Sequence, residues 1–390
     1  MIHPMAMIIQ YCILTYLTIQ VGYLLFFSLA GKLVKSTPFA AAKKLRTIRI
    51  FIPGYKEDAV IISTAKNAIS QNYPADLYEV VIIADSFSQA TLNTLRSLPI
   101  KVVEVSFENS TKGKALQKAI EATEATPVDI LVILDADNHM APGFLHAINN
   151  AFDQGYEVVQ GHRTAKNFQT SFAFLDACIE EINNHYFRRG HAAVGLPAAL
   201  IGSGMAFDWK LFVAMLHDIG ETAGEDKEFE FRLLRQRKKM AFLDGAFVYD
   251  EKVSSSEVFT KQRSRWLAIQ VEYFKKYFVE GWVQLFKGNI AFFNKVFQTY
   301  LFPRVLLIAT LFLWLLFVLI FSPQFIVFTV GLIVALAVSL LLGIPARWYN
   351  KQFLTALLQI PGALFSMITA MMHMGKARKT FIHTPHGETI

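Results

Sequence analysis

The sequence predicts an α/β domain with a mostly parallel sheet, enclosed between apolar segments that are long enough to cross a membrane. Two observations carry this prediction. Between residues 48 and 159, short apolar runs alternate with stretches of helical periodicity, which is the pattern of a sheet built with crossover helices. Apolar blocks lie near both ends of the chain, and 53% of the 390 residues are hydrophobic, more than in an ordinary soluble domain.

The first element is an apolar block at residues 5–30, which is long enough to cross a bilayer. Lysines follow it in place of a small-residue cleavage pattern, so we expect a retained anchor with the central domain on the cytoplasmic side. The net charge of +7 fits this view, because the basic residues gather beside apolar segments. That placement suits anionic lipid headgroups better than a nucleic-acid groove. Cys12 and Cys178 fall in different regions, which indicates a reducing compartment.

Five short apolar runs in the central region are expected to form the sheet. They are residues 48–52, 79–83, 100–105, 130–134 and 157–159. The helices expected between them cover residues 59–70, 91–97, 114–122 and 142–152. Sheets of this type bind ligands at the carboxyl ends of their strands, so the candidate site is sought there.

Helices at the membrane surface are expected in the last third of the chain. Residues 257–279 and 282–297 mix aromatic with charged side chains, which suits the membrane interface. Residues 353–373 form an apolar block with basic flanks at both ends and a break at Pro361-Gly362. If this block crossed the bilayer, one basic flank would face outward, so an interfacial or re-entrant segment is expected.

A transmembrane hairpin is predicted between these helices. Residues 305–321 and 325–342 are uncharged, and the turn that joins them contains no lysine or arginine, so its tip is expected outside. The expected boundaries are 1–34 for the anchor, 45–256 for the α/β domain, 257–298 for the first interfacial helices, 299–343 for the hairpin, 353–375 for the interfacial or re-entrant helix and 376–390 for the tail.

The run at residues 130–134 ends at two aspartates, Asp135 and Asp137, with one alanine between them. Residues i and i+2 of an extended chain point to the same side, so both carboxylates can bind one hard divalent cation. The same short pattern also fits a solvated turn, and taken alone it favours that interpretation.

Other strand ends and helix starts also carry polar residues. Glu57 follows the first strand and a Pro53-Gly54 turn, which either brings Glu57 against the base or ribose of a nucleotide or serves only as a turn. Asp85 ends the second strand, where an aspartate accepts hydrogen bonds from a nucleobase or ribose, or caps a helix. Lys114 stands in the first turn of a helix, and a helix N-terminus with lysines is a ready neighbour for phosphate.

Three further motifs lie beyond residue 200. Gly204 belongs to a Gly-Ser-Gly segment that permits close backbone approach, a weak signal alone. In the pair Glu225-Asp226, the aspartate is either part of an acidic first helical turn or a general base. In residues 262–266, Gln-Arg-Ser-Arg-Trp, the first, fourth and fifth side chains share a helix face. Arginine forks match phosphate and an indole stacks on a sugar ring, but a basic amphipathic helix at headgroup level explains the same residues equally well.

Taken in order, these residues resemble the processive type of family 2 glycosyltransferases, the membrane group that includes cellulose, hyaluronan and poly-N-acetylglucosamine synthases and the related lipid glucosyltransferases. The resemblance covers residues 48–387 and implies a GT-A domain, the nucleotide-diphospho-sugar transferase fold. The family pattern is D, D-x-D, (T/E)-D and Q-x-x-R-W. It is matched by Asp85, by Asp135 with Asp137, by Glu225-Asp226, and by Gln262, Arg265 and Trp266.

The resemblance implies an inverting, metal-dependent hexosyltransferase. Asp135 and Asp137 would hold the sugar nucleotide and its Mg²⁺ or Mn²⁺, and Asp226 would take the proton from the acceptor hydroxyl. Arg265 would meet the diphosphate together with Lys114. The expected substrate contacts are Pro53, Tyr55, Glu57, Asp85, Lys114, Asp135, Gly204, Glu225, Gln262, Arg263, Arg265, Trp266, Thr384 and His386.

The tail resembles the family's gating loop, in which Phe-x-Val-Thr-x-Lys follows an interface helix. Thr384 keeps its place, but His383 replaces the valine and His386 the lysine, so a permanent positive charge becomes a pH-sensitive one. Ala84 also replaces an acid that is often found before Asp85.

The function implied by the resemblance is transfer of a sugar, expected from a UDP-sugar, to a polysaccharide or glycan at the cytosolic face of a bacterial inner membrane. An enzyme that adds one sugar to a lipid is the alternative, because Q-x-x-R-W also occurs in glucosylceramide synthases and the membrane spans are few. A non-catalytic scaffold or transport component is the remote alternative. The expected partners are a nucleotide-sugar donor, an acceptor and membrane lipids but no nucleic acid, and an accessory export subunit is left open.

Overall fold

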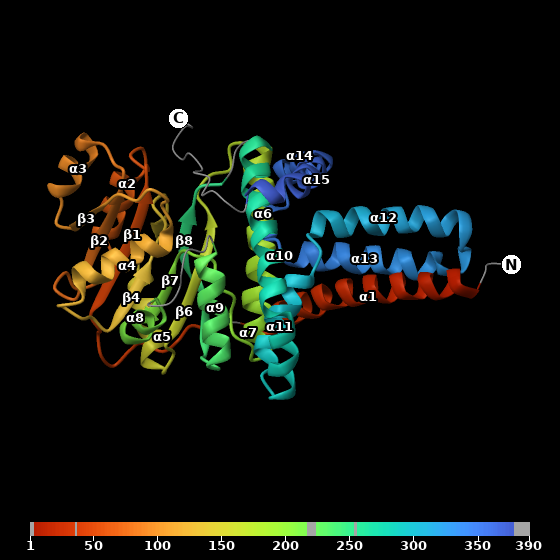
Figure 1. Ribbon diagram of the computed structural model, residues 1–390, viewed down its shortest axis with the longest axis horizontal. Helices are drawn as coiled ribbons and strands as arrows, with labels where there is room; N and C mark the ends of the chain where they lie inside the picture. Colours follow the sequence, from red (N-terminus) through yellow and green to blue (C-terminus); the bar gives the residue numbers. More distant parts are fainter. Residues whose placement is uncertain (1–3, 36, 217–223, 253–255, 378–390) are drawn as a thin grey trace.

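The computed structural model describes residues 4–35, 37–216, 224–252 and 256–377 (Figure 1). An α/β domain forms one end of the molecule, and a bundle of long helices projects from its other end. The two parts meet at a layer of helices, α6 (Ser171–Asn184), α10 (Ser256–Phe286) and α11 (Ile290–Tyr300), that stands across the bundle axis.

A mixed, mostly parallel sheet forms the centre of the α/β domain, with the strand order β3-β2-β1-β4-β7-β6-β8-β5. The strands are β1 (Ile48–Tyr55), β2 (Tyr78–Asp85), β3 (Lys101–Val105), β4 (Ile130–Ile133), β5 (His139–Met140), β6 (Val158–Ala165), β7 (Met205–Asp208) and β8 (Met240–Asp250). Parallel pairs join β1 to β2 and β4, β2 to β3, and β6 to β8, whereas β7 runs antiparallel between β4 and β6. The five predicted strands are confirmed as β1 to β4 and β6, while β5, β7 and β8 have no predicted counterpart.

Alternating side chains of the buried strands build one apolar core on each face of the sheet. In β1, Phe51 belongs to one core, and Ile50 and Ile52 belong to the other. The helices around the sheet are α2 (Ile61–Ile69), α3 (Gln89–Arg96), α4 (Lys112–Thr123), α5 (Phe144–Asp153), α7 (His191–Ala193), α8 (Trp209–Leu216) and α9 (Glu225–Arg235). Helices α2 to α5 confirm the four predicted helices.

Side-chain caps set where two of these helices begin. The Thr111 hydroxyl accepts a hydrogen bond from the backbone N–H of Lys114 at the start of α4. Ser88 accepts one from the N–H of Thr91 at the start of α3. Such caps satisfy backbone donors that a helix leaves unpaired, so each of these helices begins at the residue that follows its capping side chain.

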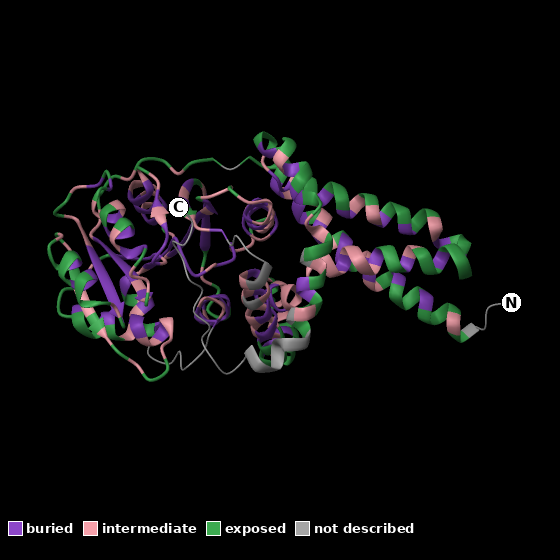
Figure 2. Ribbon diagram, turned by 90° about the horizontal axis from the view of Figure 1, so that it is seen from above, coloured by how far each residue is buried: buried purple, intermediate pink, exposed green. Residues whose placement is uncertain are grey.

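Four helices among the described residues are long and apolar enough to cross a membrane: Met5–Leu33, Arg304–Phe321, Pro323–Leu342 and Lys351–Thr369. Three of them, α1 (Pro4–Leu33), α12 (Arg304–Phe321) and α13 (Ile326–Leu342), run side by side as the projecting bundle (Figure 1). Leu17, Leu307 and Leu336 are buried in its core, and its outward faces are largely exposed (Figure 2). This is the pattern of helices whose outer surface meets lipid.

The fourth apolar segment lies apart from the bundle. It forms α14 (Lys351–Leu357) and α15 (Ile360–Ala377), which Figure 1 places beside α6 and α10. Met367 of α15 packs with Leu267 of α10 and Leu306 of α12. Helix α15 therefore packs against the layer that carries residues 262–266.

Helix α1 touches the α/β domain through two glycines. A Cβ atom on Gly190, in the π-helical turn His185–Gly190, would overlap the carbonyl oxygen of Phe27, and one on Gly31 would lie 3.0 Å from the carbonyl oxygen of His185. Nε2 of His185 donates a hydrogen bond to the Ser28 carbonyl oxygen at 2.8 Å. The two backbones are thus in direct contact at this point.

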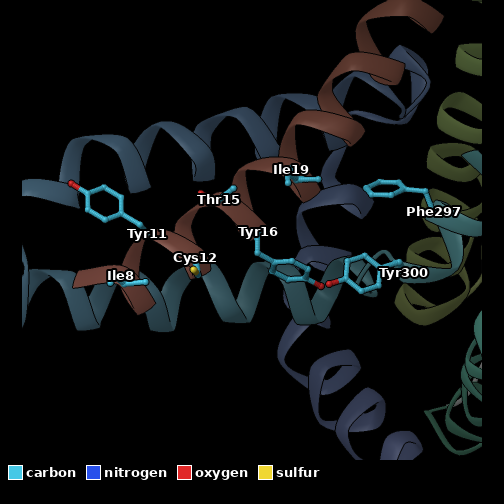
Figure 3. Close-up of a pocket in the computed structure, with 8 residues that line it drawn as sticks. All are labelled: Ile8, Tyr11, Cys12, Thr15, Tyr16, Ile19, Phe297 and Tyr300. Carbon is cyan, nitrogen blue, oxygen red and sulfur yellow. The ribbon is translucent and has the colours of Figure 1, made fainter. Parts of the chain in front are cut away.

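A shallow groove of about 510 Å³ follows the side of α1 (Figure 3). It is lined by Ile8, Tyr11, Cys12, Thr15, Tyr16, Ile19, Phe297 and Tyr300. The groove lies in the apolar bundle, and none of the predicted site residues belongs to its lining.

Candidate active site

The carboxyl ends of β1 and β2 form one side of the candidate site. Tyr55 is the register partner of Asp85, whose side chain is buried and accepts a hydrogen bond from Oγ of Ser86 at 2.9 Å. Lys56 and Ser86 both adopt left-handed backbone conformations with φ of 56° and 62°. Such conformations are uncommon for residues with side chains and cluster at functional sites. Their presence here supports this edge of the sheet as the candidate site.

Three other predicted contacts lie at the same edge. Pro53 and Tyr55 lie at the C-terminal end of β1. The Glu57 carbonyl oxygen accepts hydrogen bonds from the N–H groups of Val60 and Ile61, where the chain turns into α2. Because Asp85 ends the neighbouring parallel strand, the structure brings these residues together with it.

The two aspartates of the D-x-D motif follow β4 and differ in exposure. The Asp137 side chain is buried: its carboxylate accepts the N–H of Glu251 at 3.1 Å and Nδ2 of Asn138 at 3.0 Å. The side chain of Asp135 is 33% exposed, and its backbone N–H donates to Oγ of Ser203 at 2.9 Å. The Asp137 carboxylate is therefore held in place by hydrogen bonds from the protein, and Asp135 is the more accessible of the pair.

Lys112, at the start of α4, holds its ammonium group against Asp135. Nζ forms an ion pair with Oδ1 of Asp135 and donates to the carbonyl oxygen of Gly202 at 2.6 Å. Burial alone would lower the pKa of Lys112, but the carboxylates of Asp135 and Glu225 raise it above its usual value. The predicted Lys114 instead donates to the carbonyl oxygen of Asn109 at 3.1 Å. Lys112 is thus a site residue that the motif analysis passed over in favour of its neighbour.

The acidic pair at the start of α9 lies across Gly202 from Lys112. A Cβ atom on Gly202 would be 3.9 Å from Oδ2 of Asp226 and 3.8 Å from Nζ of Lys112. Burial by itself raises the pKa of Asp226, but Lys227 and Lys112 outweigh it and lower the pKa below its usual value. Burial raises the pKa of Glu225 to about 7. At neutral pH the Asp226 carboxylate is therefore ionised, as a general base must be.

Gly204 has a left-handed conformation with φ of 61°, and a Cβ atom there would lie 2.8 Å from Cγ2 of Val248. Its carbonyl oxygen accepts the N–H of Gly161 at 2.7 Å. The glycine is thus required for close backbone packing between strands. The adjacent Ser203 donates to Oδ1 of Asn138 at 2.6 Å, so this segment also supports the D-x-D loop.

The Gln-Arg-Ser-Arg-Trp segment lies in α10. Nη2 of Arg263 donates to Oδ1 of Asp176 at 2.6 Å, and its guanidinium lies 4.3 Å from the centre of the Trp266 ring. Trp266 and Arg265 are half-buried. Oε1 of Gln262 is buried and, within the described residues, lacks a hydrogen-bond partner. A buried amide oxygen without a partner is costly, which indicates that Gln262 meets a donor that is not a described part of this chain.

Asp135 and Asp137 are the two side chains predicted to hold a divalent cation. Over the described ranges, no group of three or more His, Cys, Asp or Glu residues is arranged to hold a metal ion. Two carboxylates are a usual share for Mg²⁺ when phosphates and water supply the other ligands, and Mn²⁺ accepts the same oxygen donors. The donor set therefore fits either ion. The predicted tail residues Thr384 and His386 lie outside the described residues.

Comparisons with known proteins point to one family. A sequence model of the family described as "Glycosyltransferase like family 2" matches residues 46–268. "Beta-monoglucosyldiacylglycerol synthase" of Trichormus variabilis is 26% identical over 227 residues, which are 56% of this chain and 48% of that protein. "Probable glycosyltransferase YdaM" of Bacillus subtilis is 24% identical over 233 residues, 57% of this chain and 55% of that protein. The chain spans about half the length of these curated relatives.

Among solved structures, the mannosyltransferase PcManGT from Pyrobaculum calidifontis, in complex with GDP-Man and Mn²⁺, matches with a TM-score of 0.57 at 16% identity. The match covers 95% of this chain and 98% of that chain. At this level of identity the likeness concerns the fold, and it extends over the helices that follow the α/β domain as well as over the sheet.

Proposed function

This chain belongs to glycosyltransferase family 2 and has the GT-A fold, and on that premise we propose that it transfers a sugar from a nucleotide diphosphate sugar to an acceptor at the cytosolic face of a membrane. One observation carries the proposal: Asp135, Lys112 and Asp226 meet around Gly202 at the carboxyl edge of the sheet. They combine an accessible carboxylate, a buried cation and an ionised carboxylate.

Each group has a chemical task in an inverting transfer. Asp226 takes the proton from the attacking acceptor hydroxyl, and Asp85 with Glu57 faces the nucleoside. Lys112 neutralises charge on the departing diphosphate, with Arg265 and Lys114 as further cations. Asp135 and Asp137 would hold a Mg²⁺ or Mn²⁺ ion, which when bound would supply Lewis-acid stabilisation of that leaving group. A single displacement needs no carboxylate nucleophile, so one base is sufficient.

A lipid is our first candidate for the acceptor. Relatives named as diacylglycerol-glucosylating synthases support this choice, as does the bundle, because α1, α12 and α13 close on one another through an apolar core. A growing polysaccharide is the second candidate, supported by the ordered D, D-x-D, (E)-D and Q-x-x-R-W residues. Incubation with labelled UDP-glucose, UDP-N-acetylglucosamine or GDP-mannose and membrane lipids, followed by sizing of the product, separates one-sugar adducts from long chains.

The base is tested by Asp226→Asn. We expect transfer to fall by a factor on the order of 10²–10⁴, the usual contribution of a general base, with Mn²⁺-dependent nucleotide binding retained. Asp129→Asn is the matched control, because Asp129 accepts the N–H of Thr47 at the opposite end of β4. Normal turnover by the Asp226 variant would refute the assignment.

A further inference from the structure

A buried ionic network centred on Glu180 lies behind the D-x-D loop. Glu180 stands on α6 and is 6% exposed. Its Oε2 lies 2.9 Å from Nη2 of Arg163 and 3.5 Å from Nζ of Lys252, and its Oε1 lies 3.9 Å from Nη1 of Arg188. One buried carboxylate therefore faces three cations from three parts of the chain.

The network reaches Asp135 through Arg163 and Asp137 through Asn138. Nη1 of Arg163 is 3.9 Å from Oδ2 of Asp135, so this guanidinium is shared unequally between Glu180 and Asp135. Nδ2 of Asn138 donates to Asp137 at 3.0 Å and to Asp250 at 2.9 Å, and Asp250 in turn pairs with Lys252 at 2.6 Å.

The balance of charge explains what Glu180 contributes. Among the described residues of the network, Arg163, Arg188 and Lys252 pair with the carboxylates of Glu180 and Asp250, and Arg163 also reaches Asp135. Without the charge of Glu180, these cations would turn to the remaining carboxylates, and two of these lie within reach of Arg163: Asp135 at 3.9 Å and Asp250 at 4.0 Å. Because the surroundings are buried, such charges are weakly screened.

We propose that Glu180 is a positioning residue for the divalent cation: it draws the Arg163 guanidinium away from Oδ2 of Asp135 and so leaves that oxygen available to the ion, while Oδ1 stays paired with Lys112. The inference rests on the proposed function, since it takes Asp135 and Asp137 as the metal ligands. Supporting residues of this kind orient metal ligands and change metal affinity without touching the ion.

The test is a Mn²⁺ titration of the full-length protein in detergent, with free Mn²⁺ measured by electron paramagnetic resonance. For Glu180→Gln we expect the Kd for Mn²⁺ to rise by a factor on the order of 10–100, the usual effect of such a residue. Glu181→Gln is the matched control. Glu181 is the next residue on α6 and is equally buried, but it pairs with His162 at 3.0 Å and accepts from Thr164 at 2.6 Å, outside the Asp135 network. Its Kd should stay at the wild-type value.

Arg163→Gln provides a measurement of opposite sign that does not depend on how well the Glu180 variant folds. Removal of the competing guanidinium should lower the Kd for Mn²⁺, and the double variant Glu180→Gln/Arg163→Gln should recover most of the affinity lost by Glu180→Gln. Equal weakening by the Glu180 and Glu181 variants, or weaker binding by Arg163→Gln, would overturn the inference. A wild-type protein that binds no Mn²⁺ would instead refute the metal assignment itself, and transfer assays in excess chelator identify that case separately.

Discussion

His162 is a buried residue whose hydrogen bonds favour the charged form. Nδ1 faces the Asp244 carbonyl oxygen at 2.9 Å, and Nε2 faces the Glu181 carboxylate at 3.0 Å, so both ring nitrogens meet acceptors. Burial alone would lower the pKa of His162, but Asp244 and Glu181 raise it to about 9. The imidazolium is therefore the form that the fold stabilises.

This shift predicts a fall in stability with rising pH. The folded pKa lies above the ordinary value of 6.5, so the contribution is complete below pH 6.5 and is lost as pH rises through about 9. It amounts to at most about 3 kcal/mol. Thermal unfolding in detergent from pH 6 to pH 9.5 should show the midpoint falling in wild type and a flatter profile for His162→Asn. Parallel profiles for the two proteins would contradict the prediction.

The residues of the site were predictable where a motif ends a strand. Asp85, Asp135 and Asp137 follow from the apolar runs before them, because parallel strands end at a common edge. Lys112 was harder to choose, since both lysines of Lys112-Gly-Lys114 stand in the same helical turn and spacing does not reveal which one points to Asp135. Glu180 carries no local signal, because its partners come from β6, from the segment that follows β8 and from the π-helical turn.

At the scale of elements, the contact between α1 and the π-helical turn depends on Gly190. A methyl group there would overlap the Phe27 carbonyl oxygen, and backbone atoms cannot move aside as a side chain can. Gly190→Ala should therefore destabilise the protein by about 1–3 kcal/mol, the usual cost of overpacking. Thermal unfolding in detergent measures the change.

Gly22→Ala is the control, because Gly22 lies in α1, the helix that packs against Gly190. A Cβ atom at Gly22 has no neighbour within 4 Å, and alanine favours a helix over glycine by up to about 1 kcal/mol. The control should leave the unfolding temperature unchanged or raise it. Equal losses of stability in the Gly190 and Gly22 variants would show that the close contact at Gly190 makes no specific contribution to stability.

Helix α6 shows why part of the fold was not predicted. This helix packs against the sheet, and Asp176, Glu180 and Glu181 are among its buried residues. A prediction from hydrophobic periodicity expects apolar residues at such positions. Each acid has a basic partner, and the pairing becomes visible only in three dimensions. Through Asp176 and Glu180, one turn apart, the same helix contacts both Arg263 and the network behind Asp135. The short β7 and the strand β8, whose apolar residues are interrupted at Asp244-Gly245, were also missed.

For the whole molecule, the distribution of basic residues predicts an orientation. The hairpin turn Pro323–Phe325 should face outside, and the α/β domain should face the cytosol. In a background with Cys12 and Cys178 replaced, Gln324→Cys should react with a membrane-impermeant maleimide on intact cells. Lys118→Cys, on the exposed surface of α4, should react only after lysis. The reverse pattern would show that the chain inserts the other way.

The packing of α1 also has a consequence for biosynthesis. Its buried polar side chains find partners far along the chain: Ser28 donates to the Ser339 carbonyl oxygen, Ser322 donates to Gln10, and Gln20 accepts the N–H of Phe302. These partners are synthesised roughly 300 residues after α1, a delay of about 15–60 s at ordinary translation rates. During that interval these polar groups of α1 lack the partners that they have in the folded protein, and the bundle closes only when the ribosome has delivered the hairpin.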